Sequence, residues 1–243
     1  MCVPSDEQLI LRLIQAFSVA VERGLPHEIA ALMCADEAEA FLDDIADLDG
    51  DEPVDPIEEP AIAVALVRVF GDLAMAYVTH PGGVEGQLFF RREERRWTVC
   101  ADAEDELSLE QLEDNVWPAV PAEVSGLVWT VHELRRKPCG SLSIEDLRLL
   151  LRQGEGVGVL LPRASNQLQW NPLAEGDFFP GDLLVATLQL GREHWARDPV
   201  SLTRIRIAID RLAELGDLTT HGAPHHQIWS EISRFQQLDS TRR

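Results

Sequence analysis

Apolar residues recur at helical spacing at the start of the chain. Six of them repeat every three or four positions: Leu9, Ile10, Leu13, Ile14, Phe17 and Val21. This period predicts an amphipathic helix, with Ser5 as its N-cap and Gly24 at its end. Two further helices are predicted at residues 27–34 and 36–45, followed by an acidic loop at residues 47–59.

The period then changes to that of β-strands. Four runs rich in β-branched and aromatic residues follow, at residues 61–70, 72–79, 84–91 and 97–101. Gly71-Asp72 is a tight connection between the first two runs, and Pro81-Gly82-Gly83 is a turn signal before the third. Helices followed by an antiparallel meander predict an α+β arrangement for this first part.

Helical spacing returns after about residue 105. A short helix or a turn is predicted at residues 108–113, and helices are predicted at residues 127–134, 143–152, 159–170, 182–190, 193–197 and 201–215. Ser143 with Asp146 three positions later forms a capping signal. A chain of 243 residues exceeds one typical domain. We therefore expect two domains, residues 1–104 with an α+β fold and residues 105–243 with a mainly α-helical fold.

The chain is strongly acidic, with a net charge of −21 and a pI near 4.6. The first 102 residues carry −14 of this charge and the remainder −7. Such a chain repels nucleic acid and anionic membranes and suits a basic protein partner, although ordinary acidic solubility gives the same composition. There is no apolar run long enough for a membrane span and no basic secretory signal, so we expect a cytoplasmic protein.

Other motifs give no support for a metal or a cofactor. The four cysteines, at positions 2, 34, 100 and 139, form no Cys-x-x-Cys pair, so neither a zinc site nor a redox pair is supported. The glycines at 154, 156 and 158 follow a helix rather than a strand, against nucleotide binding. The acidic residues at 47–51 lack the register of a calcium loop. His221, His225 and His226 are predicted to lie in an exposed loop.

The first part resembles the nuclear-transport-factor-two-like superfamily, often called SnoaL-like. The resemblance covers residues 5–102 and rests on Ala16-Phe17 in the opening helix, Arg68–Ala74 and Arg96–Cys100. It implies a bent sheet that wraps a helix and leaves a conical pocket. Some members of the superfamily isomerise or hydrate small apolar substrates in that pocket, whereas others only bind partners. Tyr77 and His80 have no base partner at a meaningful spacing, so we expect no catalysis here.

A second resemblance covers residues 107–213. It rests on Ser108–Glu113, Trp117-Pro118, Leu134–Pro138, Ile144–Leu150, the string Asn171–Leu184 and Trp195, in that order. Together they are similar to a family of immunity proteins from contact-dependent growth inhibition systems. In those systems a neighbouring bacterium delivers a toxic C-terminal domain, often a nuclease, and the immunity protein binds that domain in the cytoplasm.

The string at 171–184 is the candidate binding site. Its prolines and glycines fix a loop, and Asp182 is predicted to cap the next helix through the amides of Leu184 and Val185. The residues predicted to face a basic partner are Glu175, Asp177, Phe178, Phe179 and Asp182. A loop whose special residues serve only folding remains the alternative.

The sequence thus favours an immunity protein that masks a basic toxin domain and catalyses nothing, with no cofactor. The alternative is a small-molecule-binding or enzymatic SnoaL-like protein whose helical half is a regulatory cap. An enzyme needs a polar base in the pocket. An immunity protein needs an acidic, aromatic-bearing exposed surface on the second half.

Overall fold

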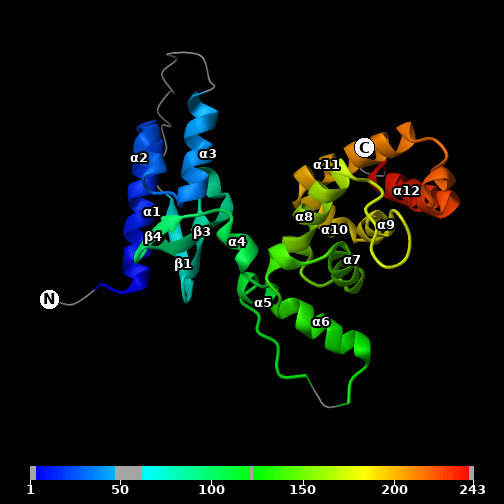
Figure 1. The fold of residues 1–243 in the computed structure, drawn as a ribbon, viewed down its shortest axis with the longest axis horizontal. Helices are drawn as coiled ribbons and strands as arrows, with labels where there is room; N and C mark the ends of the chain where they lie inside the picture. The colour runs from blue at the N-terminus through cyan, green and yellow to red at the C-terminus, as the bar shows by residue number, and fades with distance from the viewer. Residues whose placement is uncertain (1–3, 47–61, 121–122, 241–243) are drawn as a thin grey trace. The chain divides into compact units, whose positions relative to one another are not determined.

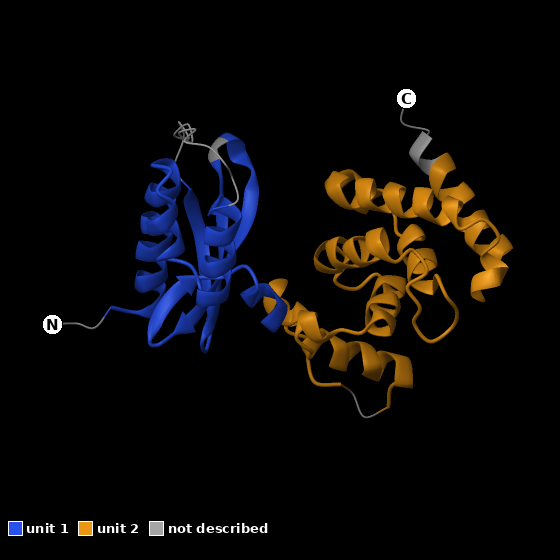
Figure 2. Cartoon of the chain, turned by 45° about the horizontal axis from the view of Figure 1, so that its top comes forward, with its two compact units in different colours: residues 1–107 blue, residues 108–243 orange. Residues whose placement is uncertain are grey.

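The computed structural model describes residues 4–46, 62–120 and 123–240, and it divides into two compact units. Unit 1 comprises Met1–Leu107 and unit 2 comprises Ser108–Arg243 (Figure 2). The fold class is α+β, with the described strands all in unit 1. The predicted acidic loop at 47–59 lies outside the described residues.

Unit 1 opens with the predicted helix, α1 (Asp6–Glu22). A capping box starts it, because the Ser5 hydroxyl accepts from the Gln8 amide while the Gln8 side chain accepts from the Ser5 amide. The next helix, α2 (Pro26–Ala30), ends earlier than the predicted residue 34. The backbone of residues 32–34 instead forms hydrogen bonds with the backbone of Val99, in the last strand of the sheet. The helix α3 (Ala35–Ala46) begins directly after these residues.

The sheet of unit 1 is an antiparallel meander in the order β1-β2-β3-β4. Its strands are β1 (Ala63–Phe70), β2 (Leu73–Thr79), β3 (Glu85–Glu93) and β4 (Arg96–Val99). One face packs on α1, and the short helix α4 (Ala103–Glu106) contacts β2 and β3 (Figure 1). Ile10, Ile14, Ala76, Phe90 and Trp97 are among the buried residues of this core. Period-2 alternation places these strand residues on one side of the sheet.

Unit 2 is built from helices. They are α5 (Leu109–Leu112), α6 (Gly126–Arg136), α7 (Ile144–Gln153), α8 (Val157–Trp170), α9 (Asp182–Leu188), α10 (Arg192–Arg197), α11 (Pro199–Glu214) and α12 (His225–Ser240), with 3-10 turns at Cys139–Ser141 and Leu218–His221. The capping box predicted for Ser143 and Asp146 is present at α7. Gly154 ends that helix with φ of +73°, a conformation that favours glycine.

The prediction that the histidines of the tail lie in an exposed loop is wrong. His225 and His226 begin α12, and His225 accepts a hydrogen bond from the Leu218 amide through Nδ1. Ile228, Ile232 and Phe235 of this helix are buried. Their i, i+4, i+7 spacing forms an apolar face, so α12 is a core element rather than a solvated tail.

The centre of unit 2 is α9, whose seven residues are all buried. It contacts α7, α8 and α12, and α8 also packs along α11 (Figure 1). A helix that buries every residue has no solvent-facing side, so it is enclosed by its neighbours. The loop that leads into α9 is consequently fixed at one end by the core. None of the helices in the described parts of the chain is long and apolar enough to cross a membrane.

Candidate functional site

The candidate site is the segment between α8 and α9, residues 171–181, which we call the site loop. Two short backbone contacts shape it. Glu175 and Pro180 form an isolated antiparallel bridge, and the Asp182 amide donates to the Phe179 carbonyl over 3.0 Å. The loop thus turns back on itself before α9 begins, with residues 176–179 at its turn.

Asp182 holds this turn from inside. It is 4% exposed, and its carboxylate accepts from the Gly176 amide at 2.7 Å and from the Phe178 amide at 3.1 Å. The predicted cap to Leu184 and Val185 is therefore wrong, because Asp182 is the first residue of α9 and its N-cap is Gly181, with φ of +94°. The carboxylate accepts from two amides of the loop, and these bonds order the loop.

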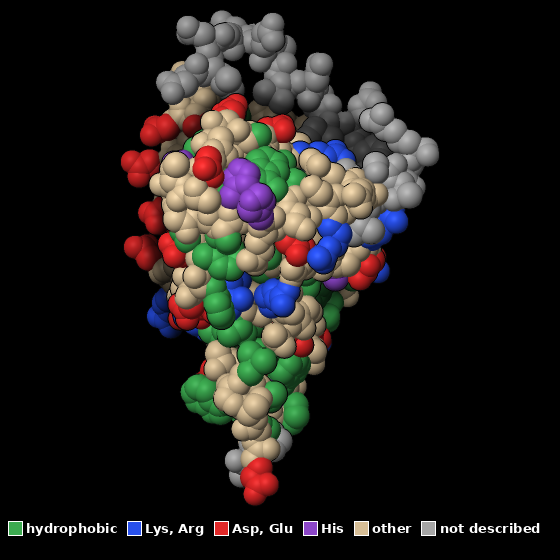
Figure 3. Space-filling view, turned by 90° about the vertical axis from the view of Figure 1, so that its right-hand side faces the viewer, with side chains coloured by type: hydrophobic (Ala, Val, Ile, Leu, Met, Phe, Trp, Pro, Cys, Tyr) green, Lys and Arg blue, Asp and Glu red, His purple; other side chains and the backbone are tan. Residues whose placement is uncertain are grey.

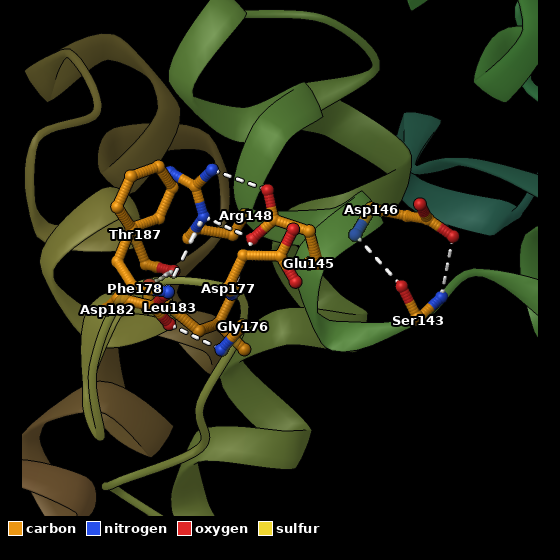
Figure 4. Close-up of polar contacts among 10 residues, drawn as sticks. All are labelled: Ser143, Glu145, Asp146, Arg148, Gly176, Asp177, Phe178, Asp182, Leu183 and Thr187. Carbon is orange, nitrogen blue, oxygen red and sulfur yellow. Dashed lines mark hydrogen bonds and ion pairs between the residues drawn. The ribbon is translucent and has the colours of Figure 1, made fainter. Parts of the chain in front are cut away.

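The loop is also fastened to α7. The Glu145 carboxylate forms a two-pronged pair with the Arg148 guanidinium, at 2.6 Å for each bond, and accepts from the Asp177 amide at 3.0 Å (Figure 4). Gly176 lies so close that a Cβ there would be 2.5 Å from a Glu145 oxygen. The close approach of the loop to α7 requires glycine at this position.

The charges at this contact reinforce each other. The hydrogen bonds from Arg148 hold the pKa of the Glu145 carboxyl below its ordinary value of 4.5, with the Asp177 amide acting in the same direction. Glu145 in turn raises the pKa of Arg148, with Asp182 and Asp177 adding to the effect. Both groups are ionised throughout the neutral range, so the loop is fastened by charge-assisted bonds.

Three of the predicted site residues face solvent. Glu175 and Asp177 are exposed, and Phe178 is 68% exposed although its ring lies over the Arg148 guanidinium (Figure 4). Phe179 is half-buried. Beside the loop is a hollow of about 260 Å³ lined by both phenylalanines, Arg148, Arg152 and residues of α9. The site therefore presents an ordered aromatic ring next to two exposed carboxylates.

Asp182 differs from the other predicted residues because it is buried. Its role in this structure is to position the loop, while Glu175, Asp177 and Phe178 supply the accessible surface. Glu145 and Arg148 were not predicted as site residues. Both lie in the Ile144–Leu150 string, and their i, i+3 spacing of opposite charges on a helix was the available signal.

A second surface was missed by the sequence analysis. Leu127, Val128 and Trp129 of α6 are 45%, 41% and 54% exposed, and Val116 is 76% exposed. Hydrophobic side chains gather at the lower end of the face shown in Figure 3, the end at which Figure 1 places α6. Exposed apolar groups of this kind can contact a partner. This surface, the α6 patch, competes with the site loop as a place for binding.

A hollow of about 780 Å³ also lies in unit 2, lined in part by Trp117, Arg135 and Glu155. Arg135 is 1% exposed, pairs with Glu113 at 2.7 Å and Glu155 at 2.9 Å, and lies over the Trp117 ring. The two terminal nitrogens of this arginine each donate a hydrogen bond to one of the two carboxylates. Arg135 is thus a buried positive charge paired with two carboxylates. These ion pairs fix α5 and α6 to the turn before α8.

The candidate catalytic residues of unit 1 are not brought into a described pocket. Tyr77 is half-buried on β2, opposite Leu66 and Gln87 in the sheet register. The hollow of about 780 Å³ in unit 1 is lined by residues of α2, α3 and the β3–β4 hairpin, and neither Tyr77 nor His80 is among them. The carboxylates that line this hollow are those of Glu93 and Glu94, and the Glu93 carboxylate accepts a hydrogen bond from the Ala35 amide at 3.2 Å.

Comparison with known proteins completes the description of the site. No curated protein and no solved structure shows significant similarity to the chain. A family model does match part of it, and the matched part contains α7, the site loop and α9. Residues 111–205 match the family of CDI immunity proteins, that is, the immunity proteins of contact-dependent growth inhibition.

Proposed function

We propose that this chain is an immunity protein that binds and neutralises the toxin domain of a contact-dependent growth inhibition system. The observation that carries the proposal is the family match over residues 111–205, which includes both the site loop and its fastening to α7. The chain acts by binding, in the cytoplasm, and performs no chemistry itself. Its target is a basic toxin domain, such as a nuclease.

The site loop has the physical properties of a binding surface. Asp182 and Glu145 hold its backbone amides, so docking a partner costs little conformational entropy. The exposed ring of Phe178 is held over Arg148, as an aromatic anchor of an interface would be. Glu175 and Asp177 lie beside it with exposed carboxylates that a basic partner can reach.

Masking of a nuclease follows from the charge of the chain. A nuclease needs a basic cleft to hold phosphate, and a protein of net charge −21 is attracted to such a cleft. Long-range attraction speeds the encounter, whereas close contacts made by the loop slow dissociation. An acidic surface placed over the cleft excludes the substrate without reacting with it.

The experiment measures binding to the toxin domain encoded beside this gene, made with an inactivating substitution in its active site. The double variant Glu175→Gln with Asp177→Asn removes two charges and keeps the shapes. We expect it to weaken binding by about 2 kcal/mol, near 30-fold, measured by calorimetry at low and raised salt. Asp210→Asn with Glu214→Gln is the matched control, because both residues are exposed on α11 and the change in net charge is equal.

Loss of affinity by both double variants to the same extent would assign the effect to net charge alone. Unchanged affinity of the loop variant would remove the site loop from the interface. A loop variant that binds weakly and also melts early would indicate a folding role for Glu175 and Asp177. The thermal midpoint of each variant is therefore recorded with each titration.

The aromatic contact is tested against the α6 patch. Phe178→Ala is expected to weaken toxin binding at least tenfold, since hot-spot aromatics are typically worth about 2 kcal/mol or more. Trp129→Ala removes an aromatic side chain of similar exposure from α6 and is expected to leave affinity within twofold. The reverse result would move the toxin-facing surface to α6 while leaving the immunity function intact.

Unit 1 is proposed to be a SnoaL-like platform without catalytic activity. Support comes from the packing of α1 on one face of an antiparallel sheet. The conical pocket that a sheet wrapped around a helix leaves in this superfamily is part of the proposal.

A further inference from the structure

Two cysteines that are far apart in the sequence meet in the core of unit 1. Cys34 immediately precedes α3 and Cys100 immediately follows β4, 66 positions later. Their side chains are almost wholly buried, at 1% and 0% exposed, and the two sulfurs are 2.7 Å apart. Sequence spacing gave no sign of this pair, because it arises from the docking of residues 32–34 against the sheet.

The backbone holds both residues in place. The Cys34 amide donates to the Val99 carbonyl, and the Val99 amide donates to the Leu32 carbonyl, each over 2.9 Å. The Cys100 amide donates to the Phe89 carbonyl of β3, also over 2.9 Å. Both cysteines are thus fixed relative to the same strands, which keeps their sulfurs close together.

Charged groups surround the two sulfurs. Burial raises the pKa of both thiols, and the Glu37 carboxylate adds to this for Cys100, whereas the Arg91 guanidinium acts in the opposite direction. Arg91 is itself paired with Glu106. Glu37 accepts a hydrogen bond from the Asp102 amide at 2.8 Å, so this carboxylate has a structural role next to Cys100.

We propose that Cys34 and Cys100 are a modification site, a buried dithiol that a small peroxide oxidises to a disulfide. The pair is suited to this because an S–S bond of about 2.05 Å requires the sulfurs to approach by only a fraction of an ångström. The linkage ties the start of α3 to the end of β4. It closes a loop containing the entire meander of unit 1.

The chemistry takes place in two balanced steps with hydrogen peroxide as the oxidant. The Cys34 thiol loses its proton as its sulfur attacks one peroxide oxygen. The O–O bond breaks and the departing hydroxide takes up that proton, so the products are the sulfenic acid of Cys34 and water. The Cys100 sulfur then attacks the Cys34 sulfur, and the S–O bond breaks. The departing hydroxide leaves as water with the Cys100 proton, so two thiols lose two electrons and one peroxide becomes two waters.

A bound metal ion is the competing interpretation, since ligand atoms of Cys34, Glu37 and Cys100 all lie within 4.8 Å of one another. Three observations favour the disulfide. Tetrahedral zinc with Zn–S bonds of about 2.3 Å places two sulfurs nearly 3.8 Å apart, so the thiols would have to separate. The nearby Arg91 guanidinium repels a cation. Glu37 already holds the Asp102 amide.

The experiment treats the full chain with hydrogen peroxide, blocks remaining thiols under denaturing conditions and maps the tryptic peptides. Cys34 and Cys100 are the sole cysteines of peptides 24–68 and 97–135, so their linkage is read directly. We expect these two peptides to be joined in most molecules, with a loss of about 2 Da from the intact chain that a reductant reverses. Zinc content is measured on the untreated protein.

Matched variants identify the pair. Cys34→Ser and Cys100→Ser should each abolish the reversible loss, whereas Cys139→Ser, at a buried cysteine of unit 2, should retain it. Circular dichroism confirms that each variant is folded. Linkage through other cysteines, oxidation that stops at sulfinic acid, or stoichiometric zinc lost in both single variants would each overturn the proposal.

Discussion

The guanidinium carbon of Arg148 lies 4.3 Å from the centre of the Phe178 ring, while its nitrogens bind Glu145. One arginine therefore connects α7 to an aromatic side chain that is otherwise mostly exposed. A cation over a ring contributes roughly 0.5–1 kcal/mol at an exposed site. This is enough to favour one ring position but too little to account for the order of the loop, which depends on hydrogen bonds to its amides.

The close approach at Gly176 predicts an unequal response of two glycines to alanine. Gly176→Ala places a Cβ against Glu145 and is expected to destabilise unit 2 by about 1–3 kcal/mol. Gly158→Ala meets open space within α8 and is expected to stabilise the protein by up to about 1 kcal/mol. Urea unfolding followed by tryptophan fluorescence measures both. Equal effects at the two positions would contradict the close packing of the loop on α7.

Asp182→Asn should loosen the site loop. The amide keeps the size of the side chain but loses the charge that two loop amides and Arg148 face. We expect a loss of about 1.5–3 kcal/mol in the free energy of unfolding, the range for hydrogen bonds to charged groups. Limited proteolysis should cleave the variant within residues 171–181. Asp177→Asn is the control, since that side chain is exposed, and it should remain resistant.

The lowered pKa of Glu145 predicts a pH-dependent contribution to stability. Because the folded pKa lies below the ordinary value of 4.5, the contribution is fully present above pH 4.5 and is lost as pH falls through the folded pKa. Glu145→Gln should therefore be less stable than the parent by about 1.5 kcal/mol at neutral pH. The difference should shrink in acid below pH 4.5. A difference that grows in acid would show that Glu145 is not paired as described.

Arg135→Ala should be one of the most damaging single changes in unit 2. It removes a 1% exposed cation and leaves Glu113 and Glu155 without their shared partner. Breaking a buried pair by removing one side typically costs about 3–5 kcal/mol. Arg192→Ala is the control, because that side chain is exposed on α10 and its loss should cost below about 1 kcal/mol. Thermal melts of the two variants measure the difference.

Tyr77→Phe and His80→Ala test the enzymatic alternative. If unit 1 performs no chemistry, both variants should protect cells from the toxin as well as the parent does. Protection is measured by co-expression with the toxin domain, and circular dichroism checks folding. Loss of protection by either folded variant would favour a functional pocket in unit 1.

Local signals in the sequence predicted local structure well. Ser5 was predicted as an N-cap, and Ser143 with Asp146 as a capping box. Both predictions are confirmed, because the partners in each cap lie within one helical turn. The four strands were placed within a few residues by their period. The predicted helix at 27–34 ended too late because hydrogen bonds between residues 32–34 and β4 depend on tertiary docking.

The errors concern contacts between distant residues. Asp182 looks like a helix cap in sequence, but the amides of Gly176 and Phe178 are brought to it by the folding of the loop. Glu145 lies 32 positions from Asp177, whose amide it accepts. The pairing of Cys34 with Cys100 has the same origin. In the tail, the helical spacing of the apolar residues 228, 232 and 235 was the signal for α12, and the prediction of an exposed loop did not use it.

The burial of α9 sets an order of events during synthesis. Its enclosure needs Ile228 of α12, which is 0% exposed and would meet a Cβ placed on Gly181 at 2.9 Å. A ribosome that has made the whole site loop has therefore not yet made the helix that closes the core behind it. Nascent chains up to about α11 leave the side of α9 that meets α12 uncovered, and transiently exposed apolar surface of this kind is prone to aggregate. The site loop is therefore expected to reach its ordered form only after α12 has been made and has packed on α9.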